Sequence, residues 1–315
     1  MNSKDTRIVF MGTPEFAVET LRALVENKYN VVAVITVPDK PAGRGQKLSI
    51  SAVKEYALSQ NLKIMQPEKL RDEAFVAELR DLKADLQIVV AFRMLPEVVW
   101  NMPPLGTFNL HASLLPNYRG AAPINWAIIN GEKKSGVTTF FIEHQIDTGN
   151  IIDQVEVDIT DDMNVGELYD KLMHIGSSLV CESIDKIADG SIVARKQDET
   201  LPMRPAPKIF KDDCRIDWTK EVQSVHNLIR GLSPYPGSWS IISNGEKELN
   251  VKLFASAIAE KSDKPAGHIE QTKNSLKVST ADAWLEITEI QIAGKKRMKT
   301  KDLLQGFSFE GFSFV

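Results

Sequence analysis

Asn109 and His111 stand two residues apart at the end of an apolar run, in the stretch NLHASLLPNYRGAAP. Side chains at such a spacing point to the same face of a β-strand, so a strand over residues 106–112 would present both to one cleft. An amide and an imidazole can together donate hydrogen bonds to a carbonyl oxygen that gains negative charge, and the loss of one such donor costs on the order of 10²–10³ in rate. The spacing alone, however, favours an Asn and a His that are hydrogen-bonded within the core.

A carboxylate that could orient His111 stands at Asp147, in the stretch EHQIDTGNII between two strand-like runs. An Asp before Thr-Gly is also ordinary turn chemistry, so the pattern leaves both interpretations open. The functional interpretation is a carboxylate on a loop that reaches the cleft of His111. Metal binding is a weaker alternative, because no second His or carboxylate stands at ligand spacing nearby, and we expect no metal.

A mainly parallel, doubly wound α/β sheet of the Rossmann-like kind is predicted to position these residues. Strand-like apolar runs over 7–11, 30–36, 85–92 and 106–112 are separated by helix-like segments, an order typical of a parallel sheet with helices on both faces. Ligands bind such sheets beyond the carboxyl ends of the strands, which locates the active cleft. The other expected elements are helices over 51–60, 72–81, 122–130 and 165–189 and strands over 137–142 and 151–157.

Two segments near that edge lack the common nucleotide-binding motifs. The stretch FMGTPEFA after the first strand has no Gly-x-Gly-x-x-Gly, which disfavours a dinucleotide-dependent oxidoreductase. The loop over 37–49 lacks the order of a P-loop. It is basic at Lys40, Arg44 and Lys47, and a mobile lid over an anionic substrate fits it better.

The second half of the chain follows a different pattern from Gly190 onward. The Pro-rich stretch 200–210 predicts an extended connector, and a helix over 221–230 and five short strand-like runs follow it. Asn244-Gly245 between two of these runs is a strong hairpin signal. Five short strands at this spacing favour a small β-barrel of the oligonucleotide-binding (OB) type. We therefore predict a catalytic domain over 1–189, a linker over 190–208 and an OB-like domain over 209–315.

The composition is that of an ordinary globular protein, with 43% hydrophobic and 25% charged residues and a net charge of −4. This charge excludes a wholly basic nucleic-acid coat protein but not a local basic surface. Lys295, Lys296 and Arg297 begin such a cluster, which is either a solvated loop or a nucleic-acid surface. Cys181 and Cys214 form no Cys-x-x-Cys, so a thiolate zinc site is excluded. Without a signal peptide or a stretch of membrane-spanning length, a cytoplasmic protein with no membrane partner is expected. No obvious dimerising helix is present, so a monomer is expected.

The sequence resembles the methionyl-tRNA formyltransferase family across essentially its whole length. Asn109, His111 and Asp147 match the family's catalytic positions. The PAGRG loop and the C-terminal barrel favour the tRNA-specific formyltransferases over related formyltransferases. The chain departs from the family at Phe92-Arg93, where many members have Tyr-Gly. The motifs that carry the resemblance are FMGTPEFA (10–17), PDKPAGRGQKL (38–48), NLHASLLPNYRGAAPI (109–124), IDTGNI (146–151), LYDKL (168–172), RIDW (215–218) and AGKKRMKTKDLL (293–304).

The resemblance implies transfer of the formyl group of 10-formyltetrahydrofolate to the free α-amino group of methionyl initiator tRNA. It implies that Asn109 and His111 stabilise an oxyanion and that Asp147 orients His111 and favours its protonated form, without a covalent intermediate. The folate is expected against Ser113, Leu114, Leu115, Pro116, Val90, Phe92 and Leu95. The tRNA is expected against Arg44, Lys47, Lys208, Lys295, Lys296 and Arg297.

Two rival functions remain open at this point. A sugar-nucleotide formyltransferase would use the same three side chains on an amino sugar, and the PAGRG loop and the basic stretch 295–301 argue against it. A folate- or RNA-binding regulator without catalysis is disfavoured by the intact Asn, His and Asp. A formyl-transfer assay would separate these alternatives.

Overall fold

The structure is a computed structural model that describes residues 2–42, 47–200 and 203–315. These residues form two compact units with separate cores. The domain boundaries expected at residues 189 and 208 stay a prediction, because the units are defined by internal contacts and not by independent folding. The first unit comprises Met1–Gly120, Gly136–Val157 and Tyr169–Pro205, and the second comprises Ala121–Ser135, Asp158–Leu168 and Ala206–Val315.

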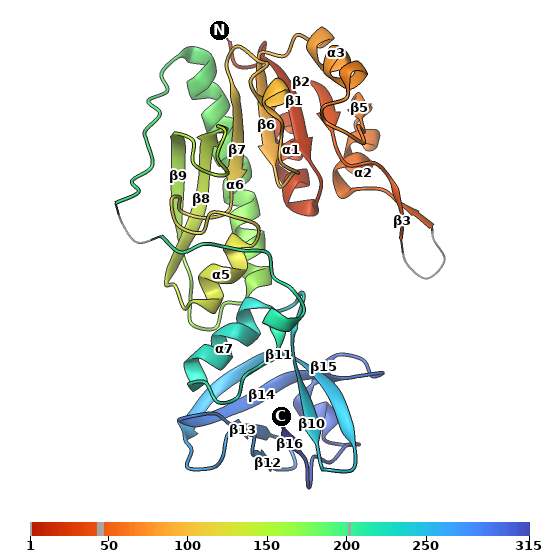
Figure 1. The fold of residues 1–315 in the computed structure, drawn as a ribbon, viewed down its shortest axis with the longest axis vertical. Helices are drawn as coiled ribbons and strands as arrows, with labels where there is room; N and C mark the ends of the chain where they lie inside the picture. Colours follow the sequence, from red (N-terminus) through yellow and green to blue (C-terminus); the bar gives the residue numbers. More distant parts are fainter. Residues whose placement is uncertain (1, 43–46, 201–202) are drawn as a thin grey trace. The chain divides into compact units, whose positions relative to one another are not determined.

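The first unit alternates strands and helices along most of its length (Figure 1). Each predicted strand and helix is present, with ends that differ by a few residues at most. The short elements β3, β4, β5 and α4 are additions that the sequence pattern does not predict. The elements are β1 (Arg7–Gly12), α1 (Glu15–Glu26), β2 (Asn30–Ile35), β3 (Lys40–Ala42), β4 (Lys47–Ser49), α2 (Ala52–Ser59), β5 (Ile64–Met65), α3 (Glu73–Asp81), β6 (Leu86–Val90), α4 (Glu97–Trp100), β7 (Thr107–His111), β8 (Lys134–Phe141), β9 (Ile151–Asp158) and α6 (Val165–Asp189).

A seven-stranded sheet in the order β5-β2-β1-β6-β7-β8-β9 forms the centre of this unit. The strands from β5 to β7 pair in parallel, and β8 pairs antiparallel with β7. The predicted mainly parallel, doubly wound sheet is therefore confirmed. The chain extends the sheet to one side of β1 through β2 and β5, and to the other side through β6 and β7. The crevice that binds ligands in such sheets therefore lies at the carboxyl ends of β1 and β6, beside β7.

Both faces of this sheet are covered by helices. On one face, Val9 and Met11 of β1 share a hydrophobic cluster with Leu79 of α3. On the other, α1 and α6 lie together, and the rings of Phe16 and Tyr169 meet edge to face at 5.2 Å between centroids. Burial on both faces explains why these strands appear in the sequence as continuous apolar runs.

The basic loop over 37–49 contains a two-stranded antiparallel hairpin made by β3 and β4. Asp39, at its base, accepts hydrogen bonds from Lys54 Nζ at 2.5 Å and from Gln66 Nε2 at 2.7 Å. These bonds fasten the base of the hairpin to α2 and to the segment after β5. Arg44 lies outside the described residues.

The second unit contains an antiparallel sheet and the helix α7 (Figure 1). The helix and the five strands predicted after residue 209 are present as α7 and β10 to β14, and β15 and β16 are two short additions. Its elements are α5 (Pro123–Ile129), a 3-10 turn (Asp212–Cys214), α7 (Val222–Gly231), β10 (Ser238–Ser243), β11 (Glu248–Lys261), β12 (Ile269–Gln271), β13 (Leu276–Ser279), β14 (Ala283–Ile292), β15 (Met298–Lys299), α8 (Thr300–Leu303) and β16 (Ser313–Phe314).

This sheet curls into a barrel-like form, as the sequence predicts. Its order is β12-β13-β14-β11-β10-β16, with β15 added to β14, and every pair is antiparallel. The pairing of β11 with β14 shifts register between Leu253 and Ala255 and again between Ile258 and Lys261, and such irregularities bend a strand. The hairpin at Gly245 is confirmed, since this residue has a φ of +86° between β10 and β11.

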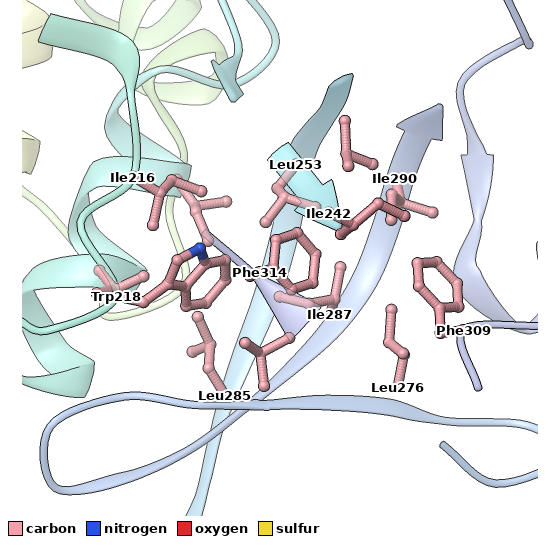
Figure 2. Close-up of a cluster of buried hydrophobic side chains, with 14 of the residues drawn as sticks. Ile216, Trp218, Ile242, Leu253, Leu276, Leu285, Ile287, Ile290, Phe309 and Phe314 are labelled. Carbon is pink, nitrogen blue, oxygen red and sulfur yellow. The ribbon is translucent and has the colours of Figure 1, made fainter. Parts of the chain in front are cut away.

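The RIDW motif contributes Ile216 and Trp218 to the core of the second unit. Ile216 and Trp218 alternate inward from the segment before α7 and pack against Leu285 and Phe314 (Figure 2). The Trp218 ring lies 4.7 Å from that of Phe314, and its indole N–H donates to Ser240 Oγ at 3.0 Å. The motif is therefore explained by packing, with the one polar atom of the indole satisfied.

Candidate active site

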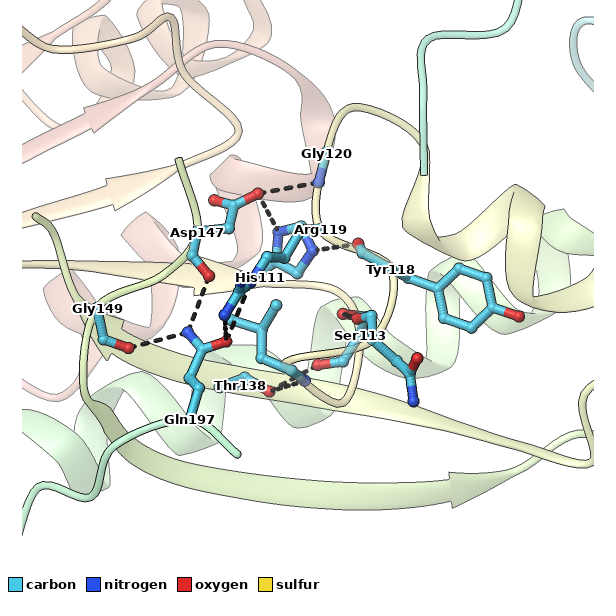
Figure 3. Close-up of polar contacts among 11 residues, drawn as sticks. His111, Ser113, Tyr118, Arg119, Gly120, Thr138, Asp147, Gly149 and Gln197 are labelled. Atoms are coloured by element: carbon cyan, nitrogen blue, oxygen red, sulfur yellow. Dashed lines mark hydrogen bonds and ion pairs between the residues drawn. The ribbon is translucent and has the colours of Figure 1, made fainter. Parts of the chain in front are cut away.

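His111 ends β7, and Asp147 faces it from the loop between β8 and β9 (Figure 3). Nδ1 of His111 lies 3.8 Å from Oδ2 of Asp147, which is an ion-pair distance and longer than a hydrogen bond. The two side chains are only 7% and 14% exposed, so water screens their attraction less than at the surface. The distance that the sequence leaves open is therefore short enough for the carboxylate to act on the imidazole.

The turn at residues 118–120 contacts both members of this pair. Nε2 of His111 lies 2.8 Å from the carbonyl oxygen of Tyr118, and a carbonyl only accepts, so Nε2 carries the hydrogen in this contact. The backbone N–H of Gly120 donates to Oδ2 of Asp147 at 3.0 Å. Nδ1 is then the nitrogen that faces the carboxylate, and one short turn fixes the ring and its partner together.

Asn109 shares the face of β7 on which His111 lies, because the two are separated by one residue of a regular strand. Its neighbours across the sheet are Val89 and Phe140. The side chain is half-buried, and within residues 2–42, 47–200 and 203–315 no hydrogen-bond partner is found for its amide. A half-buried amide of this kind is suited to bind a group that enters the cleft.

The residues predicted to line a folate site differ in how they are held. Val90 is fully buried at the end of β6, and Leu115 is buried in a small cluster with two residues of β8 and β9. The hydroxyl of buried Ser113 donates to a backbone carbonyl at 2.6 Å. Leu114 and Pro116 are half-buried. Of residues 113–116, Leu114 and Pro116 are therefore the two whose side chains are exposed enough to contact a ligand.

The segment after β6 is anchored by Arg93. Its Nη1 donates to the carbonyl of Glu68 at 2.9 Å and its Nη2 donates to the carbonyl of Pro67, while burial lowers the pKa of the guanidinium. Phe92 and Leu95 on either side of it pack against the cluster between the sheet and α3. The departure from Tyr-Gly at this point therefore places an arginine that ties the strand end to the segment after β5.

Two side chains that the sequence analysis does not single out complete the network around Asp147. Gln197 Nε2 donates to the backbone carbonyl of Asp147 at 2.8 Å, and Arg119 donates to Oε1 of Gln197 (Figure 3). Gln197 is 50 residues away from Asp147 along the chain, in a stretch predicted as a linker. No residue pattern marks it, because a single glutamine among prolines and charges suggests only an exposed connector.

Cations and aromatic rings lie together on the second unit near residue 208. Lys208 Nζ is 5.4 Å from the ring centroid of Phe210, which is 62% exposed. Lys211 Nζ and Arg215 Cζ lie 5.6 and 5.7 Å from the ring centroid of Trp239. Alternating cations and rings are typical of surfaces that bind nucleic-acid strands. Of these residues, only Lys208 is predicted from the sequence.

The basic stretch after β14 is exposed, and its charges differ in availability. Lys295 Nζ lies 5.2 Å from the ring centroid of Phe307, and Lys296 is exposed. Arg297 is ion-paired with Glu289 at 2.5 Å, so part of its charge is already compensated within the unit. The Lys47 side chain lies outside the described part of the structure.

Metal and thiol chemistry have little support among the described residues. Within residues 2–42, 47–200 and 203–315, no group of three or more His, Cys, Asp or Glu side chains could hold a metal ion. Burial raises the thiol pKa of Cys181 and of Cys214, which makes both poor nucleophiles. None of the described helices is long and apolar enough to cross a membrane.

Comparisons with known proteins show which family the chain is similar to. A family model described as formyl transferase matches residues 6–184, and one described as the formyl transferase C-terminal domain matches residues 208–308. Methionyl-tRNA formyltransferases of Bacteroides fragilis and Bacteroides thetaiotaomicron are 56% and 58% identical, each over 98% of this chain and 97% of the relative. An N-formyltransferase from Helicobacter canadensis, solved with folinic acid and dTDP-3-aminofucose, shares the fold with a TM-score of 0.68 at 24% identity, over 90% of this chain and 98% of that one.

Proposed function

The chain belongs to the methionyl-tRNA formyltransferase family, and on that premise we propose that it transfers the formyl group of 10-formyltetrahydrofolate to the α-amino group of methionyl initiator tRNA. Identity of 56–58% over nearly the full length of relatives named for that reaction supports the tRNA substrate. The chemistry rests on the distance of 3.8 Å between Asp147 Oδ2 and His111 Nδ1. His111 lies on the same strand as Asn109.

The reaction needs an electrophilic carbon, an uncharged amine and a path for one proton. The folate co-substrate supplies the formyl carbon as an amide-like group. Attack by the amine forms one carbon–nitrogen bond and breaks another, and a proton passes from the attacking nitrogen to the departing one. The exchange is redox-neutral and needs no further reactant.

Asn109 and His111 are proposed to stabilise the formyl oxygen as it gains negative charge. The Asn109 amide has no partner among the described residues, so it can donate without breaking an internal bond. Donation from Nε2 of His111 replaces its bond to the carbonyl of Tyr118 with one to the substrate oxygen. Each donor of this kind contributes on the order of 10²–10³ in rate.

Asp147 is proposed to act in two ways through its two carboxylate oxygens. Oδ2 accepts from the Gly120 N–H, which holds the carboxylate facing His111, where it stabilises positive charge on the imidazole. For Oδ1 no hydrogen bond is found within the described part of the chain, which leaves it available for the proton of the attacking amine.

The tRNA is proposed to bind through the cations predicted for that role. Lys208, Lys295 and Lys296 are exposed, and Phe210 beside Lys208 offers a ring on which a base or ribose can stack. Arg44, and Lys47 on the hairpin of β3 and β4, are assigned to the same substrate from the sequence motif alone.

A formylation assay with purified protein tests the proposal. The substrates are 10-formyltetrahydrofolate and methionyl initiator tRNA, and the product is separated from its substrate on an acid gel. Uncharged tRNA and a UDP-amino sugar serve as alternative acceptors. We expect product only with the charged tRNA. Formylation of the amino sugar alone would instead assign the chain to the sugar-modifying enzymes, whose likeness here is one of fold.

A further inference from the structure

The turn that carries Asp147 depends on support from other parts of the unit. Asp147 has a φ of +55°, in the left-handed region that residues other than glycine rarely adopt. Gly149 lies so close to β8 that a Cβ there would stand 1.7 Å from the carbonyl oxygen of Phe141. A backbone held in such a conformation keeps its position only when surrounding contacts determine it.

Gln197 supplies two of these contacts (Figure 3). Its Nε2 donates to the carbonyl oxygen of Asp147 at 2.8 Å and to that of Gly149 at 2.9 Å, which uses both hydrogens of the amide. Both bonds end on the backbone of the turn. They therefore fix the backbone from which the Asp147 side chain extends, and they leave its carboxylate free of bonds to Gln197.

Arg119 fixes the direction of the Gln197 amide. Its Nε and Nη2 donate to Oε1 of Gln197 at 3.1 and 2.6 Å, and Nη2 also donates to Glu199 Oε1 at 2.8 Å. A guanidinium only donates and a backbone carbonyl only accepts. The amide therefore has one orientation, with its nitrogen toward the turn, because a flip would place donor against donor and acceptor against acceptor.

Arg119 itself stands between the two residues that contact the candidate catalytic pair. Tyr118 accepts from His111 through its carbonyl at 2.8 Å, and Gly120 donates to Asp147 through its N–H at 3.0 Å. With the two amide bonds to the 147–149 turn, these contacts form a closed ring. The ring links the amide of Gln197 to both members of the pair.

We propose that Gln197 is a positioning residue, which sets the distance between Asp147 and His111 by holding the backbone of the turn. It contacts neither reacting group and acts only through Asp147, so the inference rests on the proposed function. The stretch that carries Gln197 is thereby a part of the active site and more than a connector.

A double-mutant cycle tests this role. Gln197→Ala is expected to lower kcat by roughly 10- to 100-fold while KM for both substrates stays within about twofold, because a misplaced group affects the chemical step. In an Asp147→Asn background, the same change is expected to lower kcat by no more than about threefold. Losses that simply multiply would contradict an action through Asp147.

Three further variants distinguish a positioning role of Gln197 from a nonspecific loss of structure. Gln197→Glu keeps the acceptor for Arg119 but sets a carboxylate against two carbonyl oxygens, so we expect it to be as impaired as Gln197→Ala. Gln197→Met keeps the side-chain length without any hydrogen bond and is expected to be equally slow. Glu199→Gln removes only a partly exposed ion pair of Arg119, and its kcat should stay within about twofold. Full activity in the first two variants would overturn the proposal.

A crystal structure gives a readout that does not depend on activity. In Gln197→Met, the distance from His111 Nδ1 to Asp147 Oδ2 is expected to exceed the distance in a crystal structure of the unmodified protein, and an unchanged distance would overturn the inference. The kinetic results also separate two failures. Full kcat in Asp147→Asn would refute the proposed catalytic site, whereas an impaired Asp147→Asn beside a fully active Gln197→Ala would refute only the positioning role.

Discussion

Replacement of Gly149 by alanine perturbs the Asp147 turn directly. The added Cβ would stand 1.7 Å from the carbonyl oxygen of Phe141, and real Cβ atoms essentially never come closer than 3.0 Å to a neighbour. The turn or strand β8 must therefore move by at least the difference, about 1.3 Å. This exceeds the displacement of about 1 Å that can cost on the order of 10²-fold in rate when it misplaces a reacting group.

We therefore expect Gly149→Ala to lower kcat by roughly 10²-fold with KM for tRNA nearly unchanged. The overpacking should also lower the free energy of unfolding of the first unit by about 1–3 kcal/mol. Initial rates of formylation at saturating substrate give the first quantity, and denaturant unfolding gives the second. Both effects have the same cause, so they should appear together.

Gly306→Ala is the matched control, because a Cβ at Gly306 meets no atom within 4 Å. It should change neither the rate nor the unfolding transition. A Gly149→Ala enzyme with kcat within about threefold of the unmodified protein would refute the argument that the position of this turn limits the reaction.

Three further predictions concern other parts of the chain. Burial lowers the pKa of His226, so the unfolded chain takes up a proton near pH 6.5 that the folded chain binds only at lower pH. The second unit should therefore lose stability as the pH falls below about 6.5. His226→Gln should weaken this dependence, which is measured by unfolding at about pH 5.5 and 7.5. Phe309→Ala empties a site that is 1% exposed and should lower the free energy of unfolding by about 3–5 kcal/mol, measured by denaturant titration. Arg44→Ala should raise KM for tRNA by about tenfold with folate affinity unchanged, and a loss confined to folate affinity would contradict that assignment.

The elements of the first unit are predictable because burial leaves a periodic record in the sequence. Strands buried on both faces appear as continuous apolar runs, and helices that cover them have one apolar stripe. The long helix α6 matches its predicted bounds, Val165–Asp189, because Gly190 ends it with a φ of +77°. Elements of two to four residues, such as β5 and α4, are too short to carry a period.

The active site is predictable only in part. Alternation along one strand places Asn109 and His111 on one face without any knowledge of the fold. The approach of Asp147 to His111 depends on the left-handed backbone at Asp147 and on Gln197, which lies 50 residues away along the chain. Residue type and local spacing carry no record of such long-range contacts, so Gln197 could not be found from the sequence.

The catalytic role of Asn109, His111 and Asp147 is tested most directly by the single-turnover formylation rates of Asn109→Ala, His111→Ala and Asp147→Asn, measured beside the Kd of each variant for methionyl initiator tRNA. We expect each substitution to lower the rate by roughly 10²-fold or more while Kd changes by less than about threefold, because these groups act on the formyl carbon and not on the RNA. Rates close to that of the unmodified protein in all three variants would contradict that role.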